Sequence, residues 1–238
     1  MAKFVLVHGA WHGGWCWDDV AASLRERGHE VEVVDLPGHD RPGDSSRKWN
    51  SAGAYVEAVS SAVGSCVEPP ILVGHSMGGY VVQRFLERAS VRKAVLVASV
   101  PRHGTLVPYL RAIRRHPAPA LMALATADFY RLVGSVDLTR DLFFSSETPE
   151  ATVRHTFERL QGESALAIAS MTLRRVKPNR VATPVHVIAG RYDQVFTVAE
   201  QQALADAYDT DLEVLDGGHD LMLDTCWPVL ADALHRLT

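Results

Sequence analysis

One serine in this chain has neighbours that favour chemistry. The stretch LVGHSMGGYVV, residues 72–82, places Ser76 between Gly74 and Gly78, and a further glycine follows at position 79. The G-x-S-x-G spacing is typical of a strained turn between a strand and a helix, where side chains two residues before and after the serine would collide. Such a turn projects the serine hydroxyl into a cleft. We therefore expect Ser76 to be a nucleophile, with a plain tight turn as the alternative.

Because a serine hydroxyl is a weak nucleophile near neutral pH, Ser76 needs a neighbouring base. Histidine suits this role, since its unperturbed pKa of about 6.5 lets it take up and return a proton. We favour His219, which follows the apolar run LEVLDGG at residues 212–218; an ordinary loop histidine is the alternative. His75 is expected to point away from the cleft. Three other histidines are expected on the surface: His29, His155 and His235.

The base must be held in the correct tautomer, usually by a carboxylate on its other nitrogen. Asp193, in VIAGRYDQVF at residues 187–196, lies between Ser76 and His219 along the chain. The order Ser, Asp, His is one of the known triad orders. A surface aspartate that caps the following helix is the alternative. Three other aspartates are set aside because they come too early in the chain or too close to the base: Asp35, Asp40 and Asp220.

Acyl transfer also needs donors for the oxyanion that develops on the substrate, and losing one such donor costs roughly 3 kcal/mol. One donor is expected to be the backbone N–H of Met77, directly after the nucleophile. The other is expected from VHGAWHGGW, residues 7–15, as the N–H of Ala10. We expect Gly9 to let this loop turn sharply inward. These residues together predict a serine hydrolase.

Short apolar runs precede all of these candidates. They are rich in Val, Ile and Leu and show little alternation, which indicates strands buried on both faces of a parallel sheet. Function collects at the carboxyl ends of such strands. Helical patterns separate the runs, so we predict an α/β fold: a mostly parallel six-stranded sheet with helices on both faces. The strands are expected within residues 3–9, 31–38, 71–76, 93–99, 185–190 and 212–218, and the helices within 16–28, 54–64, 79–89, 198–208 and 227–237.

Residues 101–180 break this alternation, because they contain several helical patterns and no convincing central strand. We predict a helical cap over the carboxyl edge of the sheet, inserted into a core made of residues 1–100 and 181–238. Within the cap, TPEATVRHTFERLQG predicts a helix with Thr148 as its cap and Pro149 at its first position.

Composition limits the other function classes. The 238 residues are 47% hydrophobic and 22% charged, which is typical of one soluble globular domain. A net charge of -4 disfavours nucleic-acid binding. We see no targeting or membrane segment, and the odd number of cysteines (Cys16, Cys66 and Cys226) reads as reduced thiols in a cytoplasmic protein. No metal or cofactor is predicted, and the oligomeric state, including a homodimer, stays open.

Four motifs resemble those of the α/β-hydrolase superfamily, in the branch that holds plant methylesterases, hydroxynitrile lyases and bacterial carboxylesterases. They are FVLVHGAWHGGWCW, DLPGH, GHSMGG and GGHDLML, and the resemblance extends along essentially the whole chain. It implies a cofactor-free enzyme with an α/β-hydrolase fold. It also implies the triad Ser76, Asp193 and His219, with Ala10 and Met77 as the oxyanion donors.

Two chemistries occur in that branch. Its lyases place a lysine directly after the catalytic histidine and a threonine after the first-strand histidine, whereas this chain has Asp220 and Gly9 there. An acidic group beside the base would repel departing cyanide, and Gly9 would leave the oxyanion pocket open. Both differences favour ester hydrolysis. Cyanohydrin cleavage on the same triad and a non-catalytic small-molecule receptor are the alternatives.

The cap is expected to wall a pocket for a small, mostly apolar ester. The same apolar side chains could instead pack one cap helix against another. The candidate lining residues are Trp11, Leu121, Met122, Phe129, Phe143 and Phe144.

Overall fold

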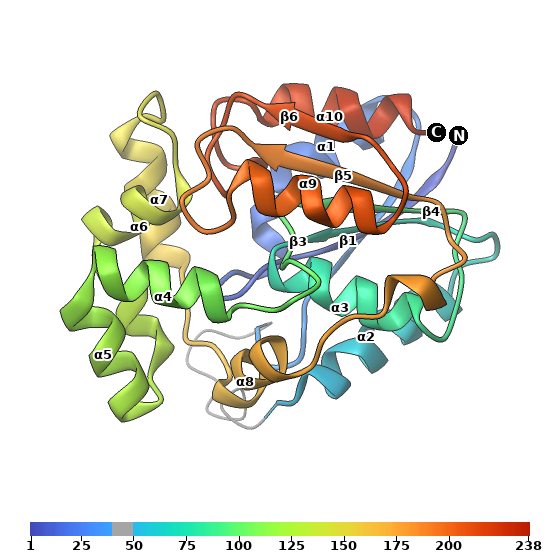
Figure 1. Cartoon of the computed structure of the whole chain (residues 1–238). Helices are drawn as coiled ribbons and strands as arrows, with labels where there is room; N and C mark the ends of the chain where they lie inside the picture. Colours follow the sequence, from blue (N-terminus) through green and yellow to red (C-terminus); the bar gives the residue numbers. More distant parts are fainter. Residues whose placement is uncertain (40–49) are drawn as a thin grey trace.

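A six-stranded sheet runs through the centre of the protein (Figure 1). The computed structural model describes residues 1–39 and 50–238, so the set-aside Asp40 lies outside it. The spatial order is β2-β1-β3-β4-β5-β6, and every neighbouring pair is parallel. The predicted strands are thus confirmed. They are β1 (Lys3–Val7), β2 (Glu30–Val34), β3 (Ile71–His75), β4 (Lys93–Val97), β5 (Val185–Gly190) and β6 (Leu212–Leu215).

The strand order reverses between β1 and β3. From β1 the chain adds β2 on one side and then returns to place β3 on the other. Such a switch point leaves a crevice at the carboxyl ends of the two strands, where ligands bind in open α/β sheets. The loop that starts at His8 follows β1, and Ser76 follows β3. The topology therefore brings two of the candidate segments to one place.

Helices cover both faces of the sheet, which explains the uninterrupted apolar runs. Alternate side chains of β1 enter different clusters: Phe4 and Leu6 pack with one pair of helices, whereas Val5 and Val7 pack with another set. The first face carries α1 (Asp18–Glu26) and α10 (Trp227–Arg236). The second carries α2 (Ala52–Gly64), α3 (Met77–Leu86) and α9 (Val198–Ala207).

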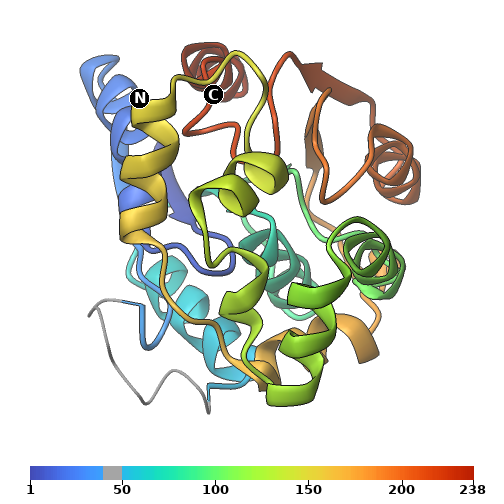
Figure 2. The ribbon, with the colours of Figure 1, turned by 90° about the vertical axis from the view of Figure 1, so that its left-hand side faces the viewer.

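The chain between β4 and β5 is helical and holds no strand. Figures 1 and 2 show most of it gathered at one end of the sheet, with a small apolar cluster of its own around Val133 and Val153. No helix of the described residues is long and apolar enough to cross a membrane. The segment contains α4 (Leu106–Arg115), α5 (Pro117–Thr126), α6 (Val136–Phe143), α7 (Glu150–Arg159) and α8 (Ala165–Leu173).

The predicted start of α7 is wrong by one residue. Pro149 is the residue before the helix, which begins at Glu150, and no side chain caps it. Thr148 does not cap because its hydroxyl donates to the buried carboxylate of Asp224, at 2.6 Å. A hydrogen bond to a charged group stabilises the fold more than an ordinary cap contact does, so the hydroxyl of Thr148 bonds the carboxylate and not the helix end.

The predicted surface position of His29 is also wrong. Its side chain is buried between the start of β1 and the end of α10. Its Nδ1 accepts from the amide of Ala2 at 3.2 Å, and its Nε2 lies 2.8 Å from Nδ1 of His235. His155 and His235 are exposed, as expected.

Candidate active site

Ser76 sits on a strained turn between β3 and α3. Its backbone has φ +50° and ψ -115°, a combination that non-glycine residues rarely adopt. The two flanking glycines are required by close packing: a Cβ on Gly74 would lie 2.6 Å from the carbonyl oxygen of Gly78, and a Cβ on Gly78 would lie 2.6 Å from that of Val7. The turn therefore has the geometry that the G-x-S-x-G pattern predicts.

The structure brings Ser76, His219 and Asp193 together from three different strand ends. The Nε2 atom of His219 lies 3.0 Å from Oγ of Ser76, and its Nδ1 lies 2.8 Å from Oδ2 of Asp193. The other oxygen of Asp193 accepts from the amides of Val195 and Phe196, at 2.7 and 2.9 Å. These two amides fix the carboxylate, which leaves one oxygen for the histidine.

The imidazole of His219 is shielded from water. The ring of Phe143 stacks near it with centroids 5.9 Å apart, and the ring of Phe196 meets it edge-on at 5.3 Å. Burial alone would lower the pKa of His219, but the charge and hydrogen bond of Asp193 outweigh it, with a further contribution from the charge of Asp220. The net result is a pKa raised above the ordinary value, so the carboxylate stabilises the imidazolium form.

Ala10 and Met77, the expected oxyanion donors, line the same pocket as Ser76. No acceptor among the described residues bonds either amide. The backbone of Gly9 is not in the left-handed region. A Cβ there would lie 2.7 Å from Nδ1 of His75, so close approach to that ring requires the glycine.

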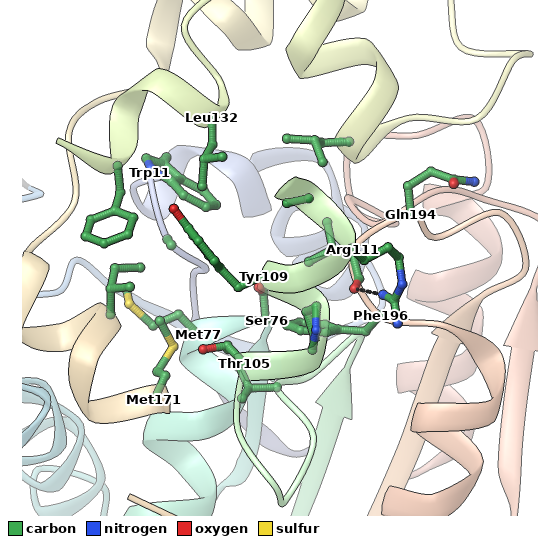
Figure 3. Close-up of a pocket in the computed structure, with 18 of the residues that line it drawn as sticks. Trp11, Ser76, Met77, Thr105, Tyr109, Arg111, Leu132, Met171, Gln194 and Phe196 are labelled. Atoms are coloured by element: carbon green, nitrogen blue, oxygen red, sulfur yellow. Dashed lines mark hydrogen bonds between the residues drawn. The ribbon is translucent and has the colours of Figure 1, made fainter. Parts of the chain in front are cut away.

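A pocket of about 830 Å³, including its mouth, opens above Ser76. Figure 3 shows Trp11 and Leu132 on one side of it and Arg111 on the other. Trp11, Phe129 and Phe143 line the pocket, as expected. Three other expected lining residues do not: Leu121 and Met122 are about half exposed on α5, and Phe144 is buried, with its backbone close to Gly218.

Several residues that line the pocket are not among those predicted from the sequence. Thr105, Pro108, Tyr109 and Ala112 come from the start and one side of α4. Their spacing of three to four residues places Pro108 and Ala112 on one face of a helix, which is a signal that the sequence contains. Other missed residues come from α8 and from the loop after β5: Ile168, Met171, Val195 and Phe196.

The polar side chains of the pocket wall already have partners. The hydroxyl of Tyr109 donates to the carbonyl oxygen of Ala120 at 2.7 Å, and Thr105 Oγ1 lies 2.7 Å from Thr172 Oγ1. The guanidinium of Arg111 donates to Glu200 at 2.8 Å, among other contacts. A bound molecule would therefore meet apolar surface away from the serine.

Asp220 does not face the pocket. Its side chain is fully buried, and Oδ2 lies 2.9 Å from Nε2 of His12. Asp220 therefore does not contact a departing anion, and the repulsion expected from its charge would act through space. The expectation that Asp220 does not orient the base is consistent with the structure, because Asp220 bonds His12 and leaves His219 to Asp193.

The same region does not suit a resident metal. His75, His219 and Asp220 offer donor atoms within 4.8 Å of one another. However, both ring nitrogens of His219 are engaged, one by Ser76 and the other by Asp193. A metal would need lone pairs on these nitrogens.

Comparison with known proteins agrees with this geometry. Among curated proteins, a carbendazim hydrolyzing esterase of Nocardioides sp. (strain SG-4G) is 42% identical over 112 residues, which is 44% of this chain and 45% of that protein. Methyl jasmonate esterase 1 of Vitis vinifera is 42% identical over 96 residues, covering 40% and 37%. The chain thus matches less than half the length of these relatives.

Solved structures show the same fold. An extracellular alpha/beta-hydrolase from a Paenibacillus species, described as sharing structural and functional homology with tobacco salicylic acid binding protein 2, superposes with a TM-score of 0.77. The superposition covers 99% of this chain and 98% of that one at 17% identity. A profile of the alpha/beta hydrolase family matches residues 4–233, so the resemblance seen in the motifs is confirmed. This chain belongs to the alpha/beta hydrolase family.

Proposed function

We propose that this protein hydrolyses carboxylic esters through an acyl-serine intermediate. The observation that carries the proposal is the continuous contact from Ser76 Oγ to His219 Nε2, at 3.0 Å, and from His219 Nδ1 to Asp193, at 2.8 Å, at the floor of an apolar pocket. Relatives that are named as esterases support it.

In the acylation step, Ser76 Oγ attacks the ester carbonyl carbon and its proton passes to His219 Nε2. The carbonyl oxygen becomes an oxyanion, to which the amides of Ala10 and Met77 donate. When the C–O bond breaks, the alcohol leaves with the proton that His219 took up. The acyl group stays on the serine oxygen.

In the deacylation step, water replaces the alcohol. His219 takes a proton from the water as the water attacks the acyl carbon, and the second tetrahedral intermediate uses the same two amides. Its collapse breaks the bond to Ser76 Oγ, and His219 returns the proton to that oxygen. The products are a carboxylic acid and the regenerated serine. Throughout, Asp193 keeps the imidazole in the tautomer that presents a lone pair to Ser76.

The substrate we infer is a small, mostly apolar ester. Most of the wall is apolar, so apolar groups of the substrate gain from burial there. The polar side chains of the wall, which include Arg111 and Arg115, are bonded to protein groups. We also propose that residues 101–180 act as the cap that builds this wall. A cytoplasmic location and a homodimer stay predictions from the sequence.

A panel of p-nitrophenyl esters tests the proposal, with Ser76→Ala as the control. We expect turnover by the wild-type protein and a loss of 10³-fold or more in the variant. Intact-mass spectrometry of a rapidly quenched reaction is expected to show one acyl adduct on the wild-type chain alone. Equal turnover by both proteins would contradict the nucleophile assignment. Cyanide release from mandelonitrile that depends on Ser76 would instead favour the lyase alternative.

A further inference from the structure

A buried histidine–aspartate pair joins two loops of the site. His12 lies in the loop after β1, and Asp220 directly follows His219 in the loop after β6. His12 Nε2 lies 2.9 Å from Asp220 Oδ2, and His12 Nδ1 lies 2.7 Å from the carbonyl oxygen of Ala10. Both side chains are at most 1% exposed. The pair therefore connects the loop that carries the base to Ala10, the residue proposed to supply an oxyanion amide.

The two contacts fix how many protons the pair holds. The carbonyl of Ala10 can only accept, so Nδ1 of His12 must carry a proton. A second proton lies between Nε2 of His12 and Oδ2 of Asp220, because two acceptors would not approach to 2.9 Å. A pair that holds both protons is electrically neutral, which limits the cost of burying it. Its ring orientation is therefore set from both sides.

The loop that His12 holds is strained. Trp11, the residue after Ala10, has φ +64°, and a bulky residue in this region costs on the order of 1–3 kcal/mol. The surrounding contacts must compensate for that strain. The carbonyl of Trp11 accepts from the amide of Gln161 at 2.9 Å, and the carbonyl of Ala10 accepts from His12. The histidine thus holds the peptide group next to the Ala10 amide.

A second histidine connects the turn of the nucleophile Ser76 to the loop after β6, which carries the base His219. Nε2 of His75, the residue before Ser76, donates to the carbonyl oxygen of His219 at 3.1 Å. The same nitrogen lies 3.6 Å from Oδ1 of Asp220, an oxygen that has no hydrogen-bond partner among the described residues. Burial, together with the neighbouring rings of His219 and His12, holds the pKa of His75 well below its usual value. His75 is therefore neutral, with one proton for the carbonyl.

We propose that Asp220 and His12 are positioning residues, which hold the Ala10 amide where the oxyanion develops. Their contact fixes the loop after β1, which carries Ala10, relative to the loop after β6, which carries His219. The inference rests on the proposed ester hydrolysis. An amide that donates mainly in the transition state affects kcat more than KM. A displacement of about 1 Å in such a site can cost on the order of 10²-fold in rate.

The first test compares Asp220→Ala with Asp220→Asn. An asparagine amide can donate to His12 Nε2 while Nδ1 keeps its proton for Ala10, so this variant is the conservative rescue. We expect kcat within about threefold of wild type for Asp220→Asn and a fall of about 10- to 100-fold for Asp220→Ala, with KM little changed. The inhibition constant of an alkyl trifluoromethyl ketone, which adds to Ser76 as an oxyanion, is expected to rise in parallel with the loss of kcat.

The second test separates activity from stability at His12 itself. In His12→Asn the amide nitrogen can replace Nδ1 and bond Ala10, but the contact with Asp220 is lost. In His12→Gln the longer side chain can reach Asp220, but the contact with Ala10 is lost. Since an unpaired buried acid costs more than an unpaired carbonyl, we expect His12→Asn to have the lower Tm and the higher kcat.

The outcomes are distinct. If kcat follows Tm across these four variants, or if Asp220→Ala keeps the kcat and the trifluoromethyl ketone affinity of Asp220→Asn, the pair is structural only and the inference is overturned. If Asp220→Ala does not fold, the two His12 variants decide. Absence of Ser76-dependent turnover in the wild-type protein would overturn the proposed function first, and the inference with it.

Discussion

The carboxylate of Asp224 accepts a hydrogen bond from the amide of Gly218 at 2.7 Å, directly before the base His219. The same oxygen accepts from the amide of Ser145 at 2.8 Å, and the other oxygen accepts from the hydroxyl of Thr148 at 2.6 Å. Asp224 is fully buried. One side chain therefore fixes the loop of the base against the end of α6 and the start of α7.

Removing this carboxylate is expected to destabilise the fold. Asp224→Ala leaves several buried donors without an acceptor, so we expect the free energy of unfolding to fall by about 3–5 kcal/mol. Thr148→Val removes one of these bonds and is expected to cost about 1.5–3 kcal/mol. Urea unfolding followed by circular dichroism measures both. A loss below 1 kcal/mol for Asp224→Ala would contradict the role of this contact.

The same residue makes stability depend on pH. Burial alone would raise the pKa of Asp224, but the hydrogen bonds from Thr148, Gly218, Ser145 and Thr225 outweigh it and lower the pKa in the folded protein. A lowered native pKa means stability that is present above the unfolded value of about 3.9 and is lost as pH falls through the native value. We expect the stability of Asp224→Asn to fall less steeply than that of wild type below about pH 4. Equal slopes would contradict the prediction.

Two glycines make a matched test of the nucleophile turn. A Cβ on Gly78 would press on the backbone carbonyl oxygens of Val7 and His8, which cannot move without disturbing β1. A Cβ on Gly64, at the end of α2, would meet no atom of the described residues within 4 Å. We expect Gly64→Ala to stabilise the protein by about 0.5–1 kcal/mol and Gly78→Ala to destabilise it by several times that amount. Thermal unfolding of the two variants checks this, and equal shifts in Tm would be inconsistent with the packing described.

The sheet could be predicted from the sequence because its strands are buried on both faces. Burial leaves an uninterrupted run of Val, Ile and Leu, which is hard to mistake when it ends in glycine or aspartate. The topology then places Ser76 and His219 at one sheet edge without knowledge of any contact. The triad candidates follow from that logic together with the chemistry of each residue type.

The pocket wall could not be predicted in the same way. Hydrophobicity shows that α5 is apolar but does not show which of its faces is buried. The small residues Ala120 and Ala123 face inward there, so that α4 can approach closely, and Leu121 and Met122 are left outside.

The pair of His12 and Asp220 was also invisible in the sequence. Its members lie 208 positions apart. Neither carries a local pattern that names the other.

The pH dependence of hydrolysis is expected to report the environment of His219. Its pKa is raised, mainly by Asp193 against the effect of burial. The base is active when neutral, so kcat/KM should fall as pH drops through a value above the ordinary 6.5 or so. Asp193→Asn is expected to lower kcat by about 10⁴-fold and to move the fall of kcat/KM to lower pH. Asp216→Asn changes an exposed aspartate that bonds Arg191 and should leave the pH at which kcat/KM falls unchanged. If kcat/KM of Asp193→Asn fell at the same pH as that of the wild-type protein, the assignment of Asp193 as the partner of His219 would be contradicted.

The wall of the pocket should decide which acyl or alcohol groups fit. Phe129 lines the pocket, whereas Met122 is 47% exposed on the outer face of α5. Shortening Phe129 to alanine enlarges an apolar wall, so we expect kcat/KM for p-nitrophenyl octanoate to rise relative to the acetate by about 10-fold, in line with about 1–3 kcal/mol for apolar pocket contacts. Met122→Ala makes a change of similar chemistry outside the pocket and should leave the ratio within twofold of wild type. The ratio comes from kcat/KM measured with both esters for the wild-type protein, Phe129→Ala and Met122→Ala. If both variants shift the ratio alike, the effect comes from general loosening of the helices and not from the wall beside Ser76.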